Sequence, residues 1–497
     1  CVRLRKKYGM TKTGKTGKPR RKRIYEEIYD VIYEGNDFMN VKVTDTKRDT
    51  ALASQPIPKL ILSFAVPAVI GMIAGAVYNI VDRIFVGQFV GSSGLAAITV
   101  SFPAMLLMLA CAMMISVGGS SRVSILYGAG RRRAAEQALG TSFTLMAIAG
   151  LAIAAASFFV TEPLIRLSGG DGAVLALARP YLQIILLGAP LAIAGFGINA
   201  LVRSCGSPRY AMATQVVGAA ANVALDALFI IKFNMGVTGA ALGTVIAQAI
   251  SVVFGLCFFY SKRTPLHIRR AFLGKLRLDV IKRIFAVGSA PFFMELSFVG
   301  YMTLMNQFIF RYGGELGLSA MGIFFSLDSL LFLPAIAIGE ATQPIIGYNY
   351  GAGKPTRVLH AVYCSVAMTV GFYCVSLFVA EIFAEPLMRL FTSDPALLKI
   401  GVPGMKIGYY GIPFMGVTIV ANATLQGLGK GRASFILSFL RYVLCMFLPL
   451  FILPELYGLA GVWMTFPAGD VGGCVIATFF IVRTVKWLKS DDAFKAL

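Results

Sequence analysis

Long apolar runs recur along the chain, and they constrain the fold more than any other feature of the sequence. Each run is about 20 residues or longer, which is the length that a helix needs to cross the hydrocarbon core of a bilayer. The chain is 57% hydrophobic and only 14% charged, whereas soluble domains carry roughly 25% charged residues. The sequence therefore predicts an all-α polytopic membrane protein with twelve transmembrane helices. Their approximate ranges are 60–87, 94–126, 138–161, 178–202, 211–231, 238–260, 284–310, 317–345, 359–384, 402–426, 434–454 and 459–484.

The sequence repeats itself at a fixed spacing. The loop sequence Tyr127-Gly-Ala-Gly130 returns 223 residues later as Tyr350-Gly-Ala-Gly353, and the same shift relates residues 162–167 to residues 385–390. Each half of the chain holds six predicted spans, so both halves enter the membrane from the same side. We therefore expect two six-helix lobes related by a pseudo-two-fold axis along the membrane normal, with substrate bound between them.

The formal net charge of +22 is explained by where the basic residues lie. Eleven of the 46 Lys and Arg lie before Met39, and most of the others fall in short loops between apolar runs, above all in the loop between the sixth and seventh spans. A positive excess of this kind keeps loops in the cytoplasm. We therefore expect both termini to be cytoplasmic, and we expect no nucleic-acid partner.

The predicted organisation has six segments. Residues 1–38 include a basic run ending at Arg23 and contain no apolar stretch, so we expect either a leader that precedes a true start at Met39 or a disordered basic arm. The remaining segments are a cytoplasmic N-terminal segment (39–57), an amino lobe (58–260), a basic cytoplasmic linker (261–283), a carboxy lobe (284–486) and a cytoplasmic tail (487–497).

We single out six acidic residues inside predicted spans. Carboxylates are costly within a bilayer and usually mark a path for an ion or a substrate. Glu340 and Asp470 fit a structural role equally well, as caps of a kink or as residues near an interface. The six residues are Asp82, Asp226, Glu295, Asp328, Glu340 and Asp470.

Helical spacing predicts that two of these acids share a pocket. Tyr78 and Asp82 lie one turn apart on the first helix, and Asn222 and Asp226 lie one turn apart on the fifth. Such a pocket can hold a proton, because burial and mutual repulsion favour the neutral acid, or it can bind a hard cation such as Na⁺ through oxygen ligands. The spacing leaves both uses open. Arg83 follows Asp82 directly, but adjacent residues on a helix diverge by about 100°, so we expect its side chain to point elsewhere.

Pro67 lies in the first apolar span, fifteen residues before Asp82. Proline removes one backbone hydrogen bond of a helix and permits a kink. A kinked helix that carries an ionisable residue can act as a gate. Proline is also simply commoner in transmembrane helices than in soluble ones, and the sequence does not decide between these interpretations.

Three separated motifs carry a family resemblance. Val81-Asp82 is followed by Phe85-Val-Gly87, Asn222-Val-Ala-Leu-Asp226 lies on the fifth span, and Gln343-Pro-Ile-Ile-Gly347 precedes the Tyr350 loop. Together with the six-and-six duplication, the chain resembles the multidrug and toxic compound extrusion (MATE) family over about residues 55–488. The resemblance implies a secondary antiporter of the bacterial cytoplasmic membrane, which exports organic, often cationic, compounds in exchange for H⁺ or Na⁺. It also implies a monomer in membrane lipid, with no cofactor and no enzymatic activity.

The resemblance also implies particular site residues. The cation-coupling pocket would comprise Asp82, Asn199, Asn222, Asp226 and Thr244, with Na⁺, if used, held at Asp82, Asn222 and Asp226. Tyr78 would line the pocket and Pro67 would be the bending point. Glu295 resembles an acidic position used by some members, and with Asp328 it would belong to the substrate cavity or to a gate.

Three other functions compete with this one. A flippase for lipid-linked oligosaccharide or another lipid would share the fold, but it would line its cavity with several cations, and we count only Arg83, Lys406 and Arg441 in the spans as candidates. An intramembrane enzyme would need a nucleophile and base or metal ligands, and the sequence shows no such motif. A channel would need a continuous pore, whereas a two-lobe repeat with buried carboxylates favours alternating access.

Overall fold

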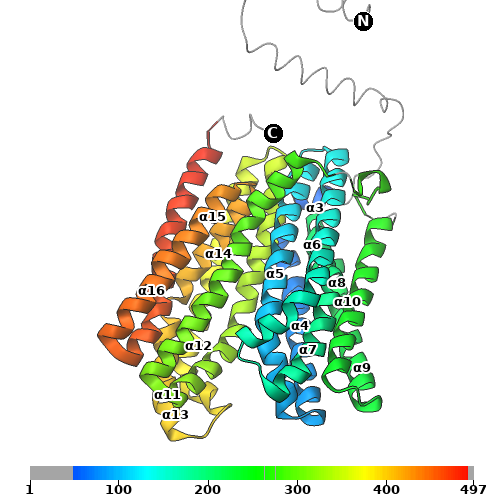
Figure 1. Ribbon diagram of the computed structural model, residues 1–497. Coiled ribbons are helices and arrows are strands. Elements are labelled where there is room, and N and C mark those ends of the chain that lie inside the picture. Colours follow the sequence, from blue (N-terminus) through cyan, green and yellow to red (C-terminus); the bar gives the residue numbers. More distant parts are fainter. Residues whose placement is uncertain (1–48, 262–263, 275, 491–497) are drawn as a thin grey trace, which may run out of the picture. The chain divides into compact units, whose positions relative to one another are not determined.

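The computed structural model describes residues 49–261, 264–274 and 276–490. The described residues from Thr50 to Ser490 belong to one compact unit, and its helices run side by side as a bundle (Figure 1). Within the described ranges every regular element is helical. The expectations for residues 1–38, for most of 39–57 and for 491–497 lie outside the described residues.

The helices fall into two halves of the chain. The amino-terminal half comprises α4 (Ile57–Phe89), α5 (Ser92–Gly128), α6 (Arg132–Leu167), α7 (Gly172–Leu187), α8 (Ala189–Ser204), α9 (Pro208–Asp226), the π-helix η1 (Ala227–Lys232) and α10 (Gly236–Tyr260). The carboxy-terminal half comprises α11 (Leu278–Gly351), α12 (Pro355–Arg389), α13 (Pro395–Tyr409), α14 (Ile412–Gly427), α15 (Gly431–Leu440), the π-helix η3 (Arg441–Phe447) and α16 (Leu448–Leu488). A short α3 (Asp49–Ser54) precedes α4, and a 3₁₀ turn, η2 (Arg270–Phe272), lies in the linker.

Many of these helices, alone or together with the next one, are long and apolar enough to cross a membrane. Eight helical stretches of the described chain meet that test, or nine if the bent pair α7 and α8 counts as one span. Two of the eight are longer than a single span, and their backbone turns at Gly314 and at Gly458. The chain is therefore a polytopic helical membrane protein, and the number of twelve crossings stays a prediction.

Three predicted boundaries need correction. The span predicted at 178–202 is broken, because α7 and α8 meet at Gly188 with a bend of 52°. The span predicted at 402–426 is also interrupted, because α13 ends at Tyr409 and α14 begins at Ile412. In both places a proline in the first turn of the second helix has no N–H to continue the first helix. The basic linker ends early, because α11 already begins at Leu278, where Asp279 places a favourable negative charge in the first turn.

The duplication appears in the helix boundaries as well as in the sequence. The starts of α6, α7, α8 and α9 are each followed, 223 residues later, by the starts of α12, α13, α14 and α15. Gly91 and Gly314 are also 223 residues apart, and both have positive φ, at 90° and 59°. The break between α4 and α5 therefore corresponds to the turn inside α11. Glycine suits both positions because L-residues with a side chain rarely adopt positive φ.

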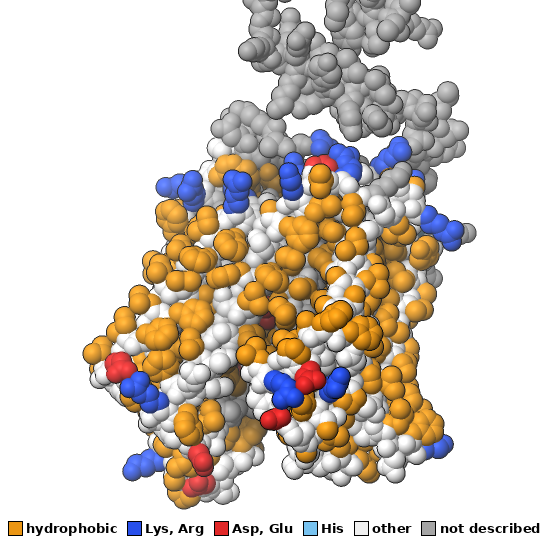
Figure 2. Space-filling view, in the orientation of Figure 1, with side chains coloured by type: hydrophobic (Ala, Val, Ile, Leu, Met, Phe, Trp, Pro, Cys, Tyr) orange, Lys and Arg blue, Asp and Glu red, His pale blue; other side chains and the backbone are white. Residues whose placement is uncertain are grey.

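Each half has its own buried core, and the halves meet closely at one end. One cluster of buried apolar residues extends from Val86 to Ile284 and another from Tyr301 to Trp463. Lys and Arg side chains gather at the end of the bundle that carries the Gly130 and Gly353 loops, which we call the basic end (Figure 2). The second halves of α5 and α11 pack together there, and the space-filling view is hollowed between the halves at the opposite end.

Candidate cation site and family membership

Polar side chains from α9 and α10 meet inside the amino-terminal half. Asn222 Nδ2 donates to Asp226 Oδ1 at 3.4 Å and to Thr244 Oγ1 at 3.3 Å. Asp226 is fully buried and Asn222 is 2% exposed. The one-turn spacing of Asn222 and Asp226 thus places both on the face of α9 that packs on α10, as the sequence pattern indicates.

Asp82 adds a second carboxylate from α4, which packs along α9. Asp82 is 8% exposed, and it lies close enough to Asp226 for the two carboxylates to interact electrostatically. Tyr78 lies near both of them, and so does Tyr181 of α7. Tyr181 was not among the predicted residues. The only signal for it was a tyrosine directly after Pro180 in an apolar run, which does not distinguish a pocket residue from a core residue.

Several oxygens of this pocket have no hydrogen-bond donor. They are Asp82 Oδ1, Asn222 Oδ1 and Asp226 Oδ2, all of them buried. A buried acceptor without a partner is costly, and three of them on neighbouring helices form a set that a proton or a hard cation would satisfy. Two carboxylates and an amide are suitable oxygen ligands for Na⁺, and either carboxylate can carry a proton. The arrangement fits both ions. We call Asp82, Asn222, Asp226 and Thr244 the amino-half pocket.

The backbone around Asp226 makes room for its carboxylate. A Cβ atom at Gly243 of α10 would collide with Asp226 Oδ1, so only glycine leaves that space free. Directly after Asp226 the helix widens into the π-helix η1. Short π-helical segments are rare in proteins, but those that occur are often found at functional sites. The carboxy-terminal half has a π-helix on the corresponding helix, η3, which begins at Arg441.

Arg83 and Pro67 both lie on α4 but outside the pocket. Arg83 is exposed beside Ile80 and Ile84. None of the ion pairs found within the described ranges includes it, although its guanidinium is close enough to Asp82 to interact with it electrostatically. Pro67 is buried, and α4 continues through it as one helix. The bending role of Pro67 stays a prediction.

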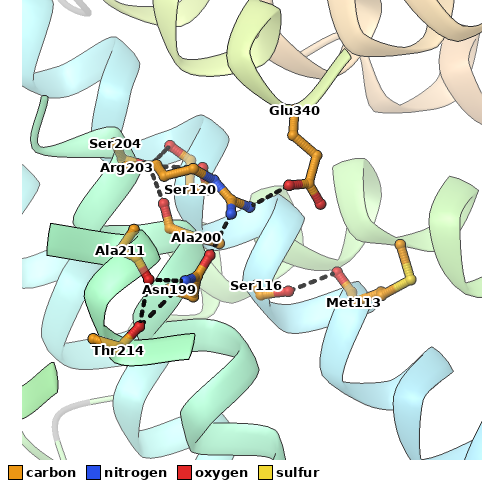
Figure 3. A network of polar contacts seen from close by, with 10 residues as sticks. All are labelled: Met113, Ser116, Ser120, Asn199, Ala200, Arg203, Ser204, Ala211, Thr214 and Glu340. Carbon is orange, nitrogen blue, oxygen red and sulfur yellow. Dashed lines mark hydrogen bonds and ion pairs between the residues drawn. The ribbon is translucent and has the colours of Figure 1, made fainter. Parts of the chain in front are cut away.

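The structure does not bring Asn199 into the amino-half pocket. Its Nδ2 donates to the Ala211 carbonyl at 2.7 Å and to Thr214 Oγ1 at 3.3 Å, and its Oδ1 accepts from Arg203 (Figure 3). Arg203 in turn forms an ion pair with Glu340 of α11. The predicted role of Asn199 as a cation ligand therefore has no support in these contacts.

The carboxy-terminal half has acidic groups of its own. Asp470 lies 3.6 Å from Arg441, and both side chains are almost fully buried. Asp328 lies beside Tyr409 and near Asp470. Glu295 is partly buried on α11, near Tyr442. Asp328 and Glu295 therefore belong to this half and do not contribute to the amino-half pocket.

Comparison with known proteins gives consistent matches. The MatE family model matches residues 67–228 and again residues 291–451, once in each half. The multidrug export protein MepA of Staphylococcus saprophyticus is 26% identical over 431 residues, which cover 86% of this chain and 94% of MepA. A MATE structure in the bent conformation has a TM-score of 0.84 at 25% identity, and covers 90% of this chain and 99% of its own. An outward-facing MATE transporter of the MOP superfamily also has a TM-score of 0.84, at 24% identity. The match covers 90% of this chain and 99% of that transporter.

The repeated family match corresponds to the duplication seen in the helix boundaries, since its two segments end 223 residues apart. The helical fold, the two matched halves and the length covered in MepA all agree. The chain belongs to the MATE family of membrane transporters.

Proposed function

We propose that this protein is a secondary antiporter of the bacterial cytoplasmic membrane. It exports organic, often cationic, compounds in exchange for H⁺ or Na⁺ by alternating access, and it works as a monomer with both termini in the cytoplasm. Small organic molecules are its substrates, and it needs no cofactor.

The observation that carries this proposal is the set of buried acceptor oxygens without donors in the amino-half pocket. A cation that enters from outside satisfies these oxygens and lowers the energy of the conformation that encloses them. A ligand shifts a conformational equilibrium only through its differential affinity for the two states. The unsatisfied oxygens provide such a difference in affinity, because a cation stabilises them most in the conformation that encloses them.

The test is efflux from proteoliposomes that contain the purified protein and a fluorescent organic cation. A Na⁺ gradient and a proton gradient are imposed separately. We expect one of them to drive efflux against the substrate gradient in the wild type, and Asp226→Asn to abolish that efflux. Asp171→Asn is the matched control, because Asp171 is an exposed carboxylate that caps α7, and an amide oxygen keeps that cap. Equal efflux with and without both gradients would refute antiport.

The alternative, a flippase for lipid-linked oligosaccharide or another lipid, has less support. A pyrophosphate-linked lipid needs unpaired cations in the cavity. Arg441 is paired with Asp470, Lys406 lies 3.7 Å from Glu381, and Arg83 is exposed among apolar side chains. No specific observation on these residues favours the flippase.

A further inference from the structure

An ion pair joins the two halves of the protein close to the basic end. Arg203 Nη2, near the end of α8, lies 3.1 Å from Glu340 Oε2 of α11. The side chains are only 11% and 25% exposed. A charged pair screened from water in this way is much harder to separate without a replacement partner than a pair on the surface.

The same arginine is connected to the helix that carries Asp226. Arg203 Nη1 donates to Asn199 Oδ1, and the Asn199 amide donates to the Ala211 carbonyl and to Thr214 on α9. Thr214 lies eight residues before Asn222 on that helix, which is about two turns. Figure 3 shows this chain of contacts running from α9 through Arg203 to Glu340. A shift of α9 therefore moves the arginine that holds the other half.

The two halves also make close contacts with each other near this ion pair. A Cβ at Gly118 would collide with the Ile284 carbonyl, and one at Gly351 would collide with the Ile125 carbonyl. Ser121 Oγ donates to the Gln426 carbonyl at 2.5 Å, and Gln343 Nε2 donates to the Val117 carbonyl at 3.0 Å. For the basic end to open, these contacts and the ion pair must separate together.

We propose that Arg203 and Glu340 form a latch that holds the basic end closed, and that Asn199 transmits movement of α9 to this latch. Arg203 and Glu340 then act as positioning residues of the transport cycle, and neither contacts the coupling ion. The inference rests on the proposed alternating access. It also assigns Asn199 a role that differs from cation binding, in agreement with its hydrogen bonds.

The test measures how often the basic end opens. In a variant whose native cysteines are replaced by serine, Ser121→Cys places one thiol at the closed interface, where Ser121 is 1% exposed. A water-soluble maleimide then reports opening through the labelling rate. We expect Glu340→Gln and Arg203→Gln to raise this rate roughly tenfold, which corresponds to about 1.4 kcal/mol. The reversed pair, Arg203→Glu with Glu340→Arg, should return the rate toward that of the parent.

Two controls separate opening from general loosening. Glu385→Gln removes a surface ion pair with Arg389 inside the carboxy-terminal half and should leave the rate unchanged. A second reporter, Ala380→Cys, lies fully buried in the carboxy-terminal core and should stay unlabelled in the latch variants. No change at Ser121→Cys, faster labelling at both reporters, or no restoration by the reversed pair would each overturn the latch. Labelling needs no gradient and no substrate, so a failure of the latch and a failure of antiport are distinguishable.

Discussion

Gly243→Ala adds one methyl group next to the candidate cation site without changing any charge. In the interior of a helix this substitution normally stabilises by about 1 kcal/mol. Here the added Cβ would lie 3.4 Å from the Asp226 backbone nitrogen, an ordinary contact, but it would overlap Asp226 Oδ1. The backbone can therefore stay in place, while the carboxylate must turn away by about 1 Å to reach normal contact.

A displacement of about 1 Å in a preorganised site can cost on the order of a hundredfold in function. We expect Gly243→Ala to raise the concentration of coupling cation that gives half-maximal efflux by roughly tenfold to a hundredfold. Efflux at saturating cation should change less, because both carboxylates are still present. The assay is the initial rate of efflux from proteoliposomes as a function of external Na⁺ or pH.

The matched control is Gly371→Ala on α12, where a Cβ would meet no atom within 4 Å. This variant should behave like the wild type. Both proteins should elute as a single sharp peak in size-exclusion chromatography before the rates are compared. If Gly243→Ala and Gly371→Ala have the same cation dependence, the position of the Asp226 carboxylate does not matter and the reasoning is refuted.

Three further predictions follow from the same geometry. Asp82→Asn should abolish gradient-driven efflux while the protein still inserts into the membrane. Efflux by this variant at the rate of the wild type would show that Asp82 does not belong to the coupling site. Pro67→Ala restores a backbone N–H within α4, so it should make substrate affinity less sensitive to the coupling cation than in the wild type. Binding titrations at several cation concentrations measure this sensitivity, and the same sensitivity in both proteins would show that Pro67 is not the bending point. Single cysteines near Gly130 and Gly353 should react with an impermeant reagent only from the cytoplasmic side, and one near Gly169 only from outside. Reaction of all three from one side would contradict the predicted topology.

Much of the fold could be predicted because the bilayer imposes it. Every backbone group in hydrocarbon must be satisfied within its own helix, so apolar runs of sufficient length became helices, and the 223-residue shift reappeared in the helix starts. The breaks at Gly188 and between α13 and α14 were missed, since hydropathy continues through them. A glycine followed within two residues by a proline was the signal present at both.

The candidate site could be predicted only in part. Asn222 and Asp226 lie on one helix, so their spacing is sufficient to place them together. Asn199 shows the limit, because its amide donates to Ala211 and Thr214 of α9, and these contacts depend on how two helices pack. The contact of Gly243 with Asp226 and the ion pair between Arg203 and Glu340 depend on the packing of helices that are distant in sequence.

Linkage between cation and substrate binding tests the central claim most directly, because it measures coupling without transport. Binding linkage is reciprocal, so a cation that disfavours the substrate-binding state must lower substrate affinity, and substrate must lower cation affinity by the same factor. The affinity of purified protein for a fluorescent organic cation would be measured over a range of Na⁺ concentrations and pH. We predict that one of these cations lowers the affinity in the wild type and in Asp171→Asn, and that the dependence is lost in Asp226→Asn. An unchanged dependence in Asp226→Asn would contradict coupling through the amino-half pocket.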